Sequence, residues 1–162
     1  MLCCVDVDYQ PTGVTTAAVG FTSWADTLAT IEVVVRSFDA PQPYEPGQFA
    51  KRELPFLLGV LERMPKLDAI LVDAYVWLAP DRPGMGKVLH DACGVPVIGV
   101  AKTRFDGATA IEVVRGDSAK PLHVTAVGFD AATAAEHVRT MHGEFRIPSL
   151  IKRADALARG NR

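Results

Sequence analysis

Two carboxylates in this sequence stand where an ionised side chain requires an explanation. Asp6 lies between Val5 and Val7 in an apolar segment, and Asp73 directly follows the apolar residues 69–72. A buried carboxylate is costly unless it meets a cation or several hydrogen-bond donors. Each residue also has an ordinary explanation, because Asp6 could pair with an arginine and Asp73 could cap a loop.

Glu53 and Lys102 extend this pair to a set that could act together. Alone, Glu53 is explained as a solvated residue at a helix start, and Lys102 as a lysine at a strand end. Three carboxylates from separate segments can instead hold one or two hard divalent cations through their oxygen atoms. Such cations polarise a phosphodiester and activate bound water, and a nearby lysine offsets charge on the phosphate. The set therefore indicates metal-assisted phosphodiester hydrolysis.

The apolar pattern predicts the elements that must position these residues. Residues 2–8, 14–21 and 30–37 are typical of three strands in an antiparallel meander. Asp6 and Asp8 are two residues apart on the first strand and so share a face. Beyond the meander we expect loops at 41–47 and 80–86, helices at 48–64 (interrupted early by Pro55), 87–93 (closed by Gly94), 130–143 (capped by Asp130) and 149–159, and strands at 69–72, 96–101, 110–114 and 122–127.

This order of elements predicts an α/β fold. We expect a ribonuclease H-like mixed β-sheet, antiparallel in its first three strands and then parallel, flanked by helices, with residues 1–162 forming a single domain. The order alone leaves a flavodoxin-like or nucleotide-binding fold open. The sequence lacks both Gly-x-Gly-x-x-Gly and Gly-x-x-x-x-Gly-Lys-Ser/Thr, so the two phosphate-binding loops with the clearest signatures are excluded.

Composition excludes several other classes of protein. With 162 residues, 49% of them hydrophobic, and a net charge of −2, the chain is not typical of disordered proteins. It has no apolar run of the roughly 20 residues that a membrane-spanning helix needs, and no basic, apolar leader. Three cysteines without disulfide or zinc spacing are expected to be reduced thiols. We therefore expect a cytoplasmic protein with no membrane partner.

Taken together, the motifs resemble those of the endonuclease V family, nucleases that nick nucleic acid near deaminated adenine (inosine). The resemblance spans most of residues 5–158. Its most specific parts are a Pro-Tyr-x-Pro-Gly loop leading into Arg-Glu-x-Pro, and a Gly-Val-Ala-Lys strand end. The matching stretches are 5–7, 43–47, 52–55, 72–73, 95–102, 145–148 and 152–158.

The resemblance implies a role for each of the four charged residues. Asp6, Glu53 and Asp73 match the family's metal-binding carboxylates, which implies Mg²⁺ or Mn²⁺ as the cofactor. Lys102 matches the family's active-site lysine. The implied activity is a metal-dependent endonuclease with DNA or RNA as its partner.

The resemblance also implies a substrate-binding loop. Tyr44 matches the tyrosine that wedges into the duplex and helps to splay the damaged base. Pro46 is one of the prolines that fix this loop, and Gly47 would let the backbone approach a flipped base closely. An aromatic side chain on a stiff loop can fill a vacated stacking position without a large ordering cost.

The sequence departs from the family pattern at two places. Family members usually continue Val-Asp-Gly-x-Gly, whereas this chain has Ala74, Tyr75 and Val76 after the aspartate. We expect these residues to reshape or close the pocket for the flipped base. The family's active-site histidine falls on Val127, and His123 is four residues upstream on an expected strand.

These departures leave alternatives open. The first function is a metal-dependent endonuclease that cuts near inosine or otherwise altered bases in DNA or RNA. The second is a catalytically impaired relative that binds nucleic acid or a protein through the same sheet face. The third is an unrelated α/β domain for a small molecule, which requires the motif matches to be accidental and would be favoured if Asp6, Glu53 and Asp73 lay far apart.

Overall fold

The computed structural model describes residues 1–38 and 49–161. In that part of the chain it has nine strands and four helices. The strands are β1 (Leu2–Gln10), β2 (Gly13–Phe21), β3 (Ile31–Ser37), β4 (Ala69–Val72), β5 (Trp77–Ala79), β6 (Arg82–Pro83), β7 (Val97–Ala101), β8 (Ile111–Val113) and β9 (Leu122–Val127). The helices are α1 (Phe49–Leu61), α2 (Met85–Cys93), α3 (Ala131–Thr140) and α4 (Ser149–Ala158).

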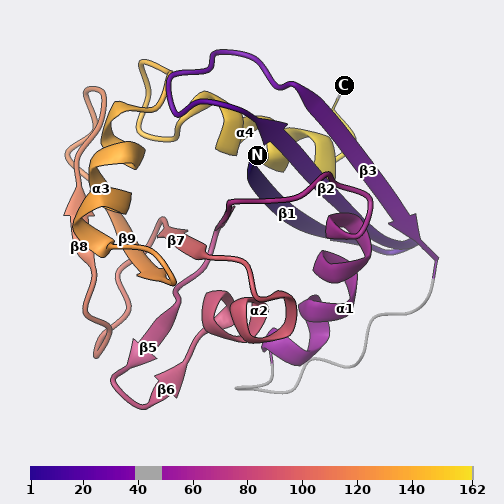
Figure 1. The fold of residues 1–162 in the computed structure, drawn as a ribbon, viewed down its shortest axis with the longest axis horizontal. Coiled ribbons are helices and arrows are strands. Elements are labelled where there is room, and N and C mark those ends of the chain that lie inside the picture. The colour runs from indigo at the N-terminus through magenta and orange to yellow at the C-terminus, as the bar shows by residue number, and fades with distance from the viewer. Residues whose placement is uncertain (39–48, 162) are drawn as a thin grey trace.

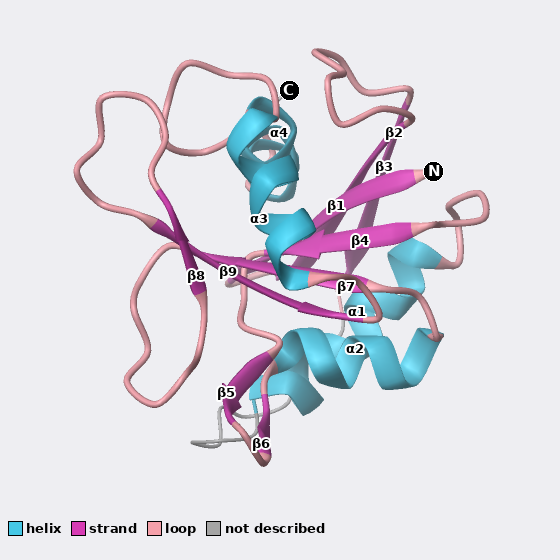
Figure 2. Cartoon of the chain, turned by 60° about the vertical axis from the view of Figure 1, so that its left-hand side comes forward, coloured by secondary structure: helices cyan, strands magenta, loops and turns pink. Residues whose placement is uncertain are grey.

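Seven of the described strands form one mixed sheet in the order β3-β2-β1-β4-β7-β9-β8 (Figures 1 and 2). β1, β2 and β3 pair antiparallel, which confirms the predicted meander. β4 runs parallel to both β1 and β7, and each of these connections passes through a helix. The ribonuclease H-like mixed sheet predicted from the sequence is therefore present.

The sheet continues with two antiparallel pairings that the sequence analysis did not include. β9 runs antiparallel to β7, and β8 pairs antiparallel with β9. No helix separates β7 from β9 in the chain, so the crossover that a parallel pairing needs is missing and the chain returns in the opposite direction.

Helices cover both faces of the sheet, with α1 and α2 on one side and α3 and α4 on the other (Figure 2). Strand β1 serves both cores, because successive side chains of a strand point to opposite faces. Cys3 and Val5 pack with α1 and α2, whereas Leu2 and Cys4 pack with α3 and α4. The central strands are therefore fixed from both sides.

Two local predictions differ from the structure. Helix α1 runs through Pro55 rather than being interrupted by it, because Leu57 and Val60 beyond the proline are fully buried in the core. The segment predicted as a loop at 80–86 instead contains the second strand of a small β5–β6 hairpin and the start of α2. Gly84 permits this, since a Cβ atom there would lie 2.3 Å from the carbonyl oxygen of Tyr75.

The predicted end of α2 and the predicted start of α3 are confirmed. Gly94 closes α2 in the left-handed conformation with φ of 71°, and the Asp130 side chain accepts a hydrogen bond from the Thr133 backbone N–H at the start of α3. Cys3, Cys4 and Cys93 are unpaired in the structure. Within the described ranges, the structure contains no helix that combines the length and apolar character needed to cross a membrane.

Candidate active site

The candidate active site lies where β4 ends beside β1. Val5 pairs with Val72 in the parallel register, so Asp6 and Asp73 follow this pair on neighbouring strands. Glu53 comes from α1, and all three carboxylates line one cavity of about 230 Å³. The structure thus brings together the three residues that the sequence analysis selected, while their role as metal ligands stays a prediction.

Four further charged residues line the same cavity: Asp8, Lys102, Asp155 and Arg159. Asp8 is the strand neighbour that was expected to share a face with Asp6. Asp155 comes from α4, which packs on β1, and the sequence analysis did not select it. The sequence did contain a clue to Asp155, because this residue belongs to the 152–158 stretch that matches the endonuclease V family motifs.

Two cations balance part of the negative charge. Lys102 Nζ lies 2.5 Å from Asp73 Oδ2, and Arg159 Nε donates to Asp155 Oδ1 at 3.0 Å. The Lys102 and Asp73 side chains are 38% and 29% exposed, so solvent or a ligand can reach the ion pair. Asp6 and Glu53 have no ion pair of their own among the described residues.

The uncompensated carboxylates titrate abnormally. Burial, followed by the charges of Asp155 and Asp73, raises the pKa of Asp6 to about 6, although Lys102 opposes the rise. Burial and the charge of Asp6 raise the pKa of Glu53 to about 8. Each group therefore favours its neutral form near pH 7 more than a solvated carboxyl does, as expected for acids that share a cavity without a cation.

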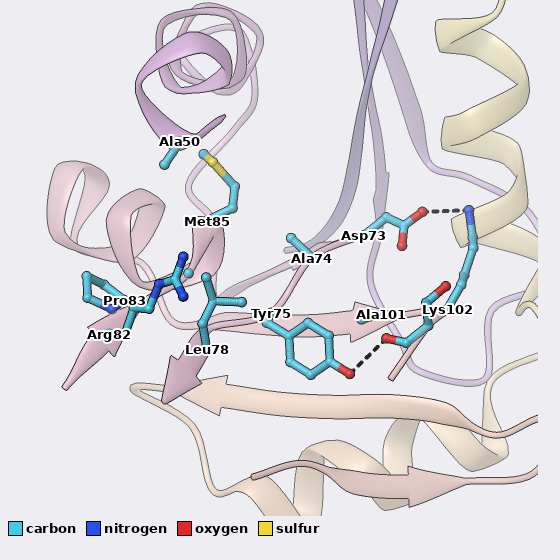
Figure 3. Close-up of a pocket in the computed structure, with 12 residues that line it drawn as sticks. Ala50, Asp73, Ala74, Tyr75, Leu78, Arg82, Pro83, Met85, Ala101 and Lys102 are labelled. Carbon is cyan, nitrogen blue, oxygen red and sulfur yellow. Dashed lines mark hydrogen bonds and ion pairs between the residues drawn. The ribbon is translucent and has the colours of Figure 1, made fainter. Parts of the chain in front are cut away.

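The carboxylates do not form a completed coordination shell. Over residues 1–38 and 49–161, no group of three or more histidine, cysteine or acidic side chains is arranged to hold a metal ion. Asp73 points toward Lys102 instead (Figure 3).

A larger cavity of about 660 Å³ also has Asp73 in its lining (Figure 3). Its lining is mainly apolar, with charged groups at Asp73, Lys102 and Arg82. The residues that line it are Ala50, Asp73, Ala74, Tyr75, Leu78, Arg82, Pro83, Gly84, Met85, Ala101, Lys102 and Thr103. The two cavities meet at Asp73 and Lys102, which line both.

The segment after Asp73 that departs from the family pattern lines this larger cavity with Ala74 and Tyr75, and the cavity remains open. The Tyr75 hydroxyl donates to the Thr103 carbonyl oxygen at 2.9 Å and accepts from the Phe105 backbone N–H at 3.1 Å. Val76 is fully buried, and its N–H donates to Thr125 Oγ1 at 2.9 Å. These bonds hold the Tyr75 ring at the edge of the cavity.

Val127, the position on which the family's active-site histidine falls, does not line the cavity of the carboxylates. Val127 pairs with Val97 at the start of β7, whereas Lys102 follows the end of that strand. At ~3.3 Å per strand residue, the two ends are about 13 Å apart. His123 pairs with Ala101 nearer the site, but it is buried beside Tyr75, with Nδ1 3.9 Å from Glu112 Oε1. Asp155 and Arg159, and not Val127, line the cavity from the C-terminal part of the chain.

The residues predicted to bind substrate, Tyr44, Pro46 and Gly47, lie outside the described residues. Their roles stay predictions from the sequence.

The chain is similar in sequence to endonuclease V proteins. The model of the Endonuclease V family matches residues 1–129. An endonuclease V of Streptomyces coelicolor is 34% identical over 179 residues, covering 96% of this chain and 76% of the relative. An endonuclease V of Nocardia farcinica is 34% identical and covers 82% of this chain and 68% of the relative. These matches exclude the third alternative, an unrelated α/β domain for a small molecule.

Solved structures share the fold. The crystal structure of endonuclease V from Streptomyces avermitilis superposes with a TM-score of 0.78 at 28% identity, covering 98% of this chain and 79% of that one. The Ciona intestinalis endonuclease V, crystallised with a 24mer DNA containing an inosine followed by a ribo-adenosine, gives a TM-score of 0.83 at 18% identity, with coverage of 98% and 84%.

Proposed function

Because this chain belongs to the endonuclease V family, we propose that it is an endonuclease that hydrolyses phosphodiester bonds in DNA or RNA near deaminated bases such as inosine. The observation that carries the proposal is the convergence of five carboxylates and Lys102 on one cavity. The Ciona relative, which binds inosine-containing DNA, supports the substrate class.

A divalent cation fits the donors of this cavity. Asp6, Glu53, Asp73 and Asp155 offer oxygen ligands only, and Asp6 and Glu53 have no ion-pair partner among the described residues. We infer that the first three hold Mg²⁺ or Mn²⁺ and that Asp155 adds a fourth carboxylate. When bound, the cation would polarise the phosphate and lower the pKa of a coordinated water.

Lys102 would act on the phosphate itself. Its ammonium group has three N–H donors, so it can keep its contact with Asp73 and also donate to a phosphate oxygen. The positive charge at Nζ would offset the negative charge that grows on the phosphate oxygens in the transition state. Arg159 would hold Asp155 in place through its hydrogen bond to Oδ1.

The larger cavity would receive the altered base. It adjoins Asp73 and Lys102, so a base bound there would lie next to the phosphate to be cut. Tyr75 would offer an aromatic wall whose hydroxyl is already engaged by Thr103 and Phe105. Tyr44, Pro46 and Gly47 remain our proposed substrate-binding residues on the sequence resemblance alone.

The test is nicking of end-labelled oligonucleotides that carry one inosine, in DNA and in RNA, with Mg²⁺, Mn²⁺ or EDTA. We expect cleavage with metal only, and its loss in Asp73→Asn. Asp91→Asn is the matched control, because Asp91 is an exposed carboxylate paired with Lys87 on α2. Failure of the wild-type chain to cut any of these strands with either metal would overturn the proposal.

A second candidate function is a nucleic-acid or protein binding module without catalysis. The pairing of Asp73 with Lys102 and the side chains at Ala74 and Val76, where the family usually has glycine, support it. Calorimetry distinguishes the two functions: this one requires nucleic-acid binding with no binding of Mg²⁺ or Mn²⁺.

We also propose that residues 1–162 act as a single domain and that the protein works in the cytoplasm. The unpaired state of Cys3, Cys4 and Cys93 supports a reducing compartment.

A further inference from the structure

A third cavity, of about 280 Å³, adjoins the candidate active site on the side of α4. It shares Lys102 and Asp155 with the carboxylate cavity. The rest of its lining is mainly apolar and comes from the segment between α3 and α4 and from α4 itself: Phe145, Arg146, Ile147, Ile151 and Lys152.

Phe145 and Lys152 form an exposed aromatic and basic pair at this cavity. Phe145 is 63% exposed, and Lys152 Nζ lies 5.5 Å from the centroid of its ring. Within residues 1–38 and 49–161, Lys152 forms no ion pair with a carboxylate. An aromatic face with a nearby uncompensated cation is the combination that binds a nucleobase and its phosphate.

The segment that carries Phe145 is held rigidly by two arginines. Arg115, which is buried, donates to the carbonyl oxygens of Gly143 at 3.1 Å, Phe145 at 3.1 Å and Arg146 at 3.3 Å. Arg146 Nη2 in turn donates to the Lys102 carbonyl oxygen. The backbone that carries the exposed ring is therefore held beside Lys102, which lowers the ordering cost of binding a ligand there.

We propose that this cavity is a subsite for a nucleotide of the cleaved strand adjacent to the scissile phosphate. The base stacks on Phe145, and the phosphate of that nucleotide contacts Lys152 Nζ. The subsite rests on the proposed function, because its continuity with the catalytic cavity through Lys102 and Asp155 places it on the path of the same strand. Its positive and aromatic lining suits a single strand with accessible bases.

The direct test is binding without chemistry. Fluorescence anisotropy in EDTA measures the Kd of a labelled inosine oligonucleotide for the wild type, Phe145→Ala and Lys152→Ala. We expect Phe145→Ala to weaken binding roughly tenfold and Phe145→Trp to retain it. Lys152→Ala should reduce the slope of log Kd against log salt by about one.

Leu28→Ala and Lys66→Ala are matched controls. Leu28 is 79% exposed, and both residues lie in loops at the end of the central strands opposite to the candidate active site. The hairpin of Leu28 follows Phe21, and Lys66 precedes Ala69; Phe21 and Ala69 both pair with Leu2 at the start of β1. We expect both controls to bind as the wild type does, and all variants to keep its melting temperature.

Strand length provides a second measurement. Oligonucleotides shortened one nucleotide at a time on either side of inosine should lose the effect of Phe145→Ala on one side only, once the strand no longer reaches the subsite. Equal Kd values for Phe145→Ala and Leu28→Ala, or an effect that does not depend on strand length, overturns the subsite.

The two proposals fail separately. A wild type that nicks inosine strands while Phe145→Ala leaves both Kd and KM unchanged supports the nuclease and overturns the subsite. A wild type that never nicks but binds in a Phe145-dependent manner overturns the nuclease and supports the subsite. In an active enzyme we expect Phe145→Ala to raise KM with little change in kcat, since stacking away from the reacting atoms stabilises ground and transition states equally.

Discussion

At the scale of single residues, the properties of the candidate active site follow from acids that share a cavity. Asp6 and Glu53 are partly buried and lie near Asp73 and Asp155, and Lys102 and Arg159 compensate only the latter two. A cation entering this cavity therefore gains more from Asp6 and Glu53 than from carboxylates that already have partners.

Because Asp6 and Glu53 lack ion-pair partners within the described ranges, the stability of the metal-free protein depends on pH. Because the pKa values of Asp6 and Glu53 are raised to about 6 and about 8, their contribution to stability is fully present below the unfolded-state pKa of about 4 and is lost as pH rises through the folded values. In EDTA we expect the melting temperature to fall between pH 5 and pH 8. Mn²⁺ should raise it, and more at pH 8 than at pH 5.5.

Differential scanning fluorimetry across this pH range measures the effect. The variant Asp6→Asn, Glu53→Gln removes both titrating groups, so its melting temperature in EDTA should vary less with pH. Equal responses of this variant and the wild type would contradict the prediction.

Asp155 is the residue whose role the structure adds. We expect Asp155→Asn to lower metal affinity or nicking rate by roughly 10- to 100-fold, because it removes one carboxylate charge from the cavity and leaves Arg159 without its partner. Nicking assays and metal titration measure the loss. Asp117→Asn, at an exposed site outside the cavity, should behave as the wild type, and equal behaviour of Asp155→Asn and this control would exclude a role for Asp155.

At the scale of elements, close packing between β7 and the segment after β4 positions Asp73. A Cβ atom on Gly99 of β7 would lie 2.3 Å from the Ala74 carbonyl oxygen and 2.6 Å from Thr125 Oγ1. Neither a backbone oxygen nor this side chain can move away freely, since Thr125 Oγ1 already accepts the Val76 N–H. The position of Ala74, and with it of Asp73, depends on the missing side chain at Gly99.

We therefore expect Gly99→Ala to destabilise the protein by about 1–3 kcal/mol and to weaken any preference for inosine. Gly59→Ala is the matched control, because nothing lies within 4 Å of a Cβ atom at that position in α1. It should stabilise by about 0.5–1 kcal/mol, since alanine favours the helix. Urea unfolding measures both, and changes of the same sign would contradict this packing argument.

At the scale of the whole molecule, the helices on both faces protect the centre of the sheet. Cys3 and Cys4 of β1 are buried on opposite faces, and burial raises the pKa of Cys3 to about 12 and holds the pKa of Cys4 well above its ordinary value. Cys93, at the end of α2, is partly exposed.

Iodoacetamide should therefore modify Cys93 first in the folded protein. Cys3 and Cys4 should react only when the sheet opens, because the reactive species is the thiolate. Peptide mass spectrometry over time measures the three rates, and Cys93→Ser should remove the fast phase. Modification of Cys3 or Cys4 at the rate of Cys93 would mean that the sheet is not closed from both sides.

The sequence by itself determined the family and the N-terminal meander. It also selected four charged residues that line one cavity: Asp6, Glu53, Asp73 and Lys102. These follow from local signals: alternating apolar residues, cap residues, and carboxylates at apolar strands, each readable within a few neighbouring positions. The motifs at 43–47 and 52–55 carried the same information about family.

Only the tertiary structure decided which residues share the site. The antiparallel return of β9 places Val127 opposite Val97 at the start of β7, and the packing of α4 on β1 brings Asp155 into the carboxylate cavity. Strand direction and helix docking depend on contacts between segments distant in sequence, so no local pattern specifies them. For the same reason, the open cavity beside Tyr75 and the subsite at Phe145 became visible only in the folded chain.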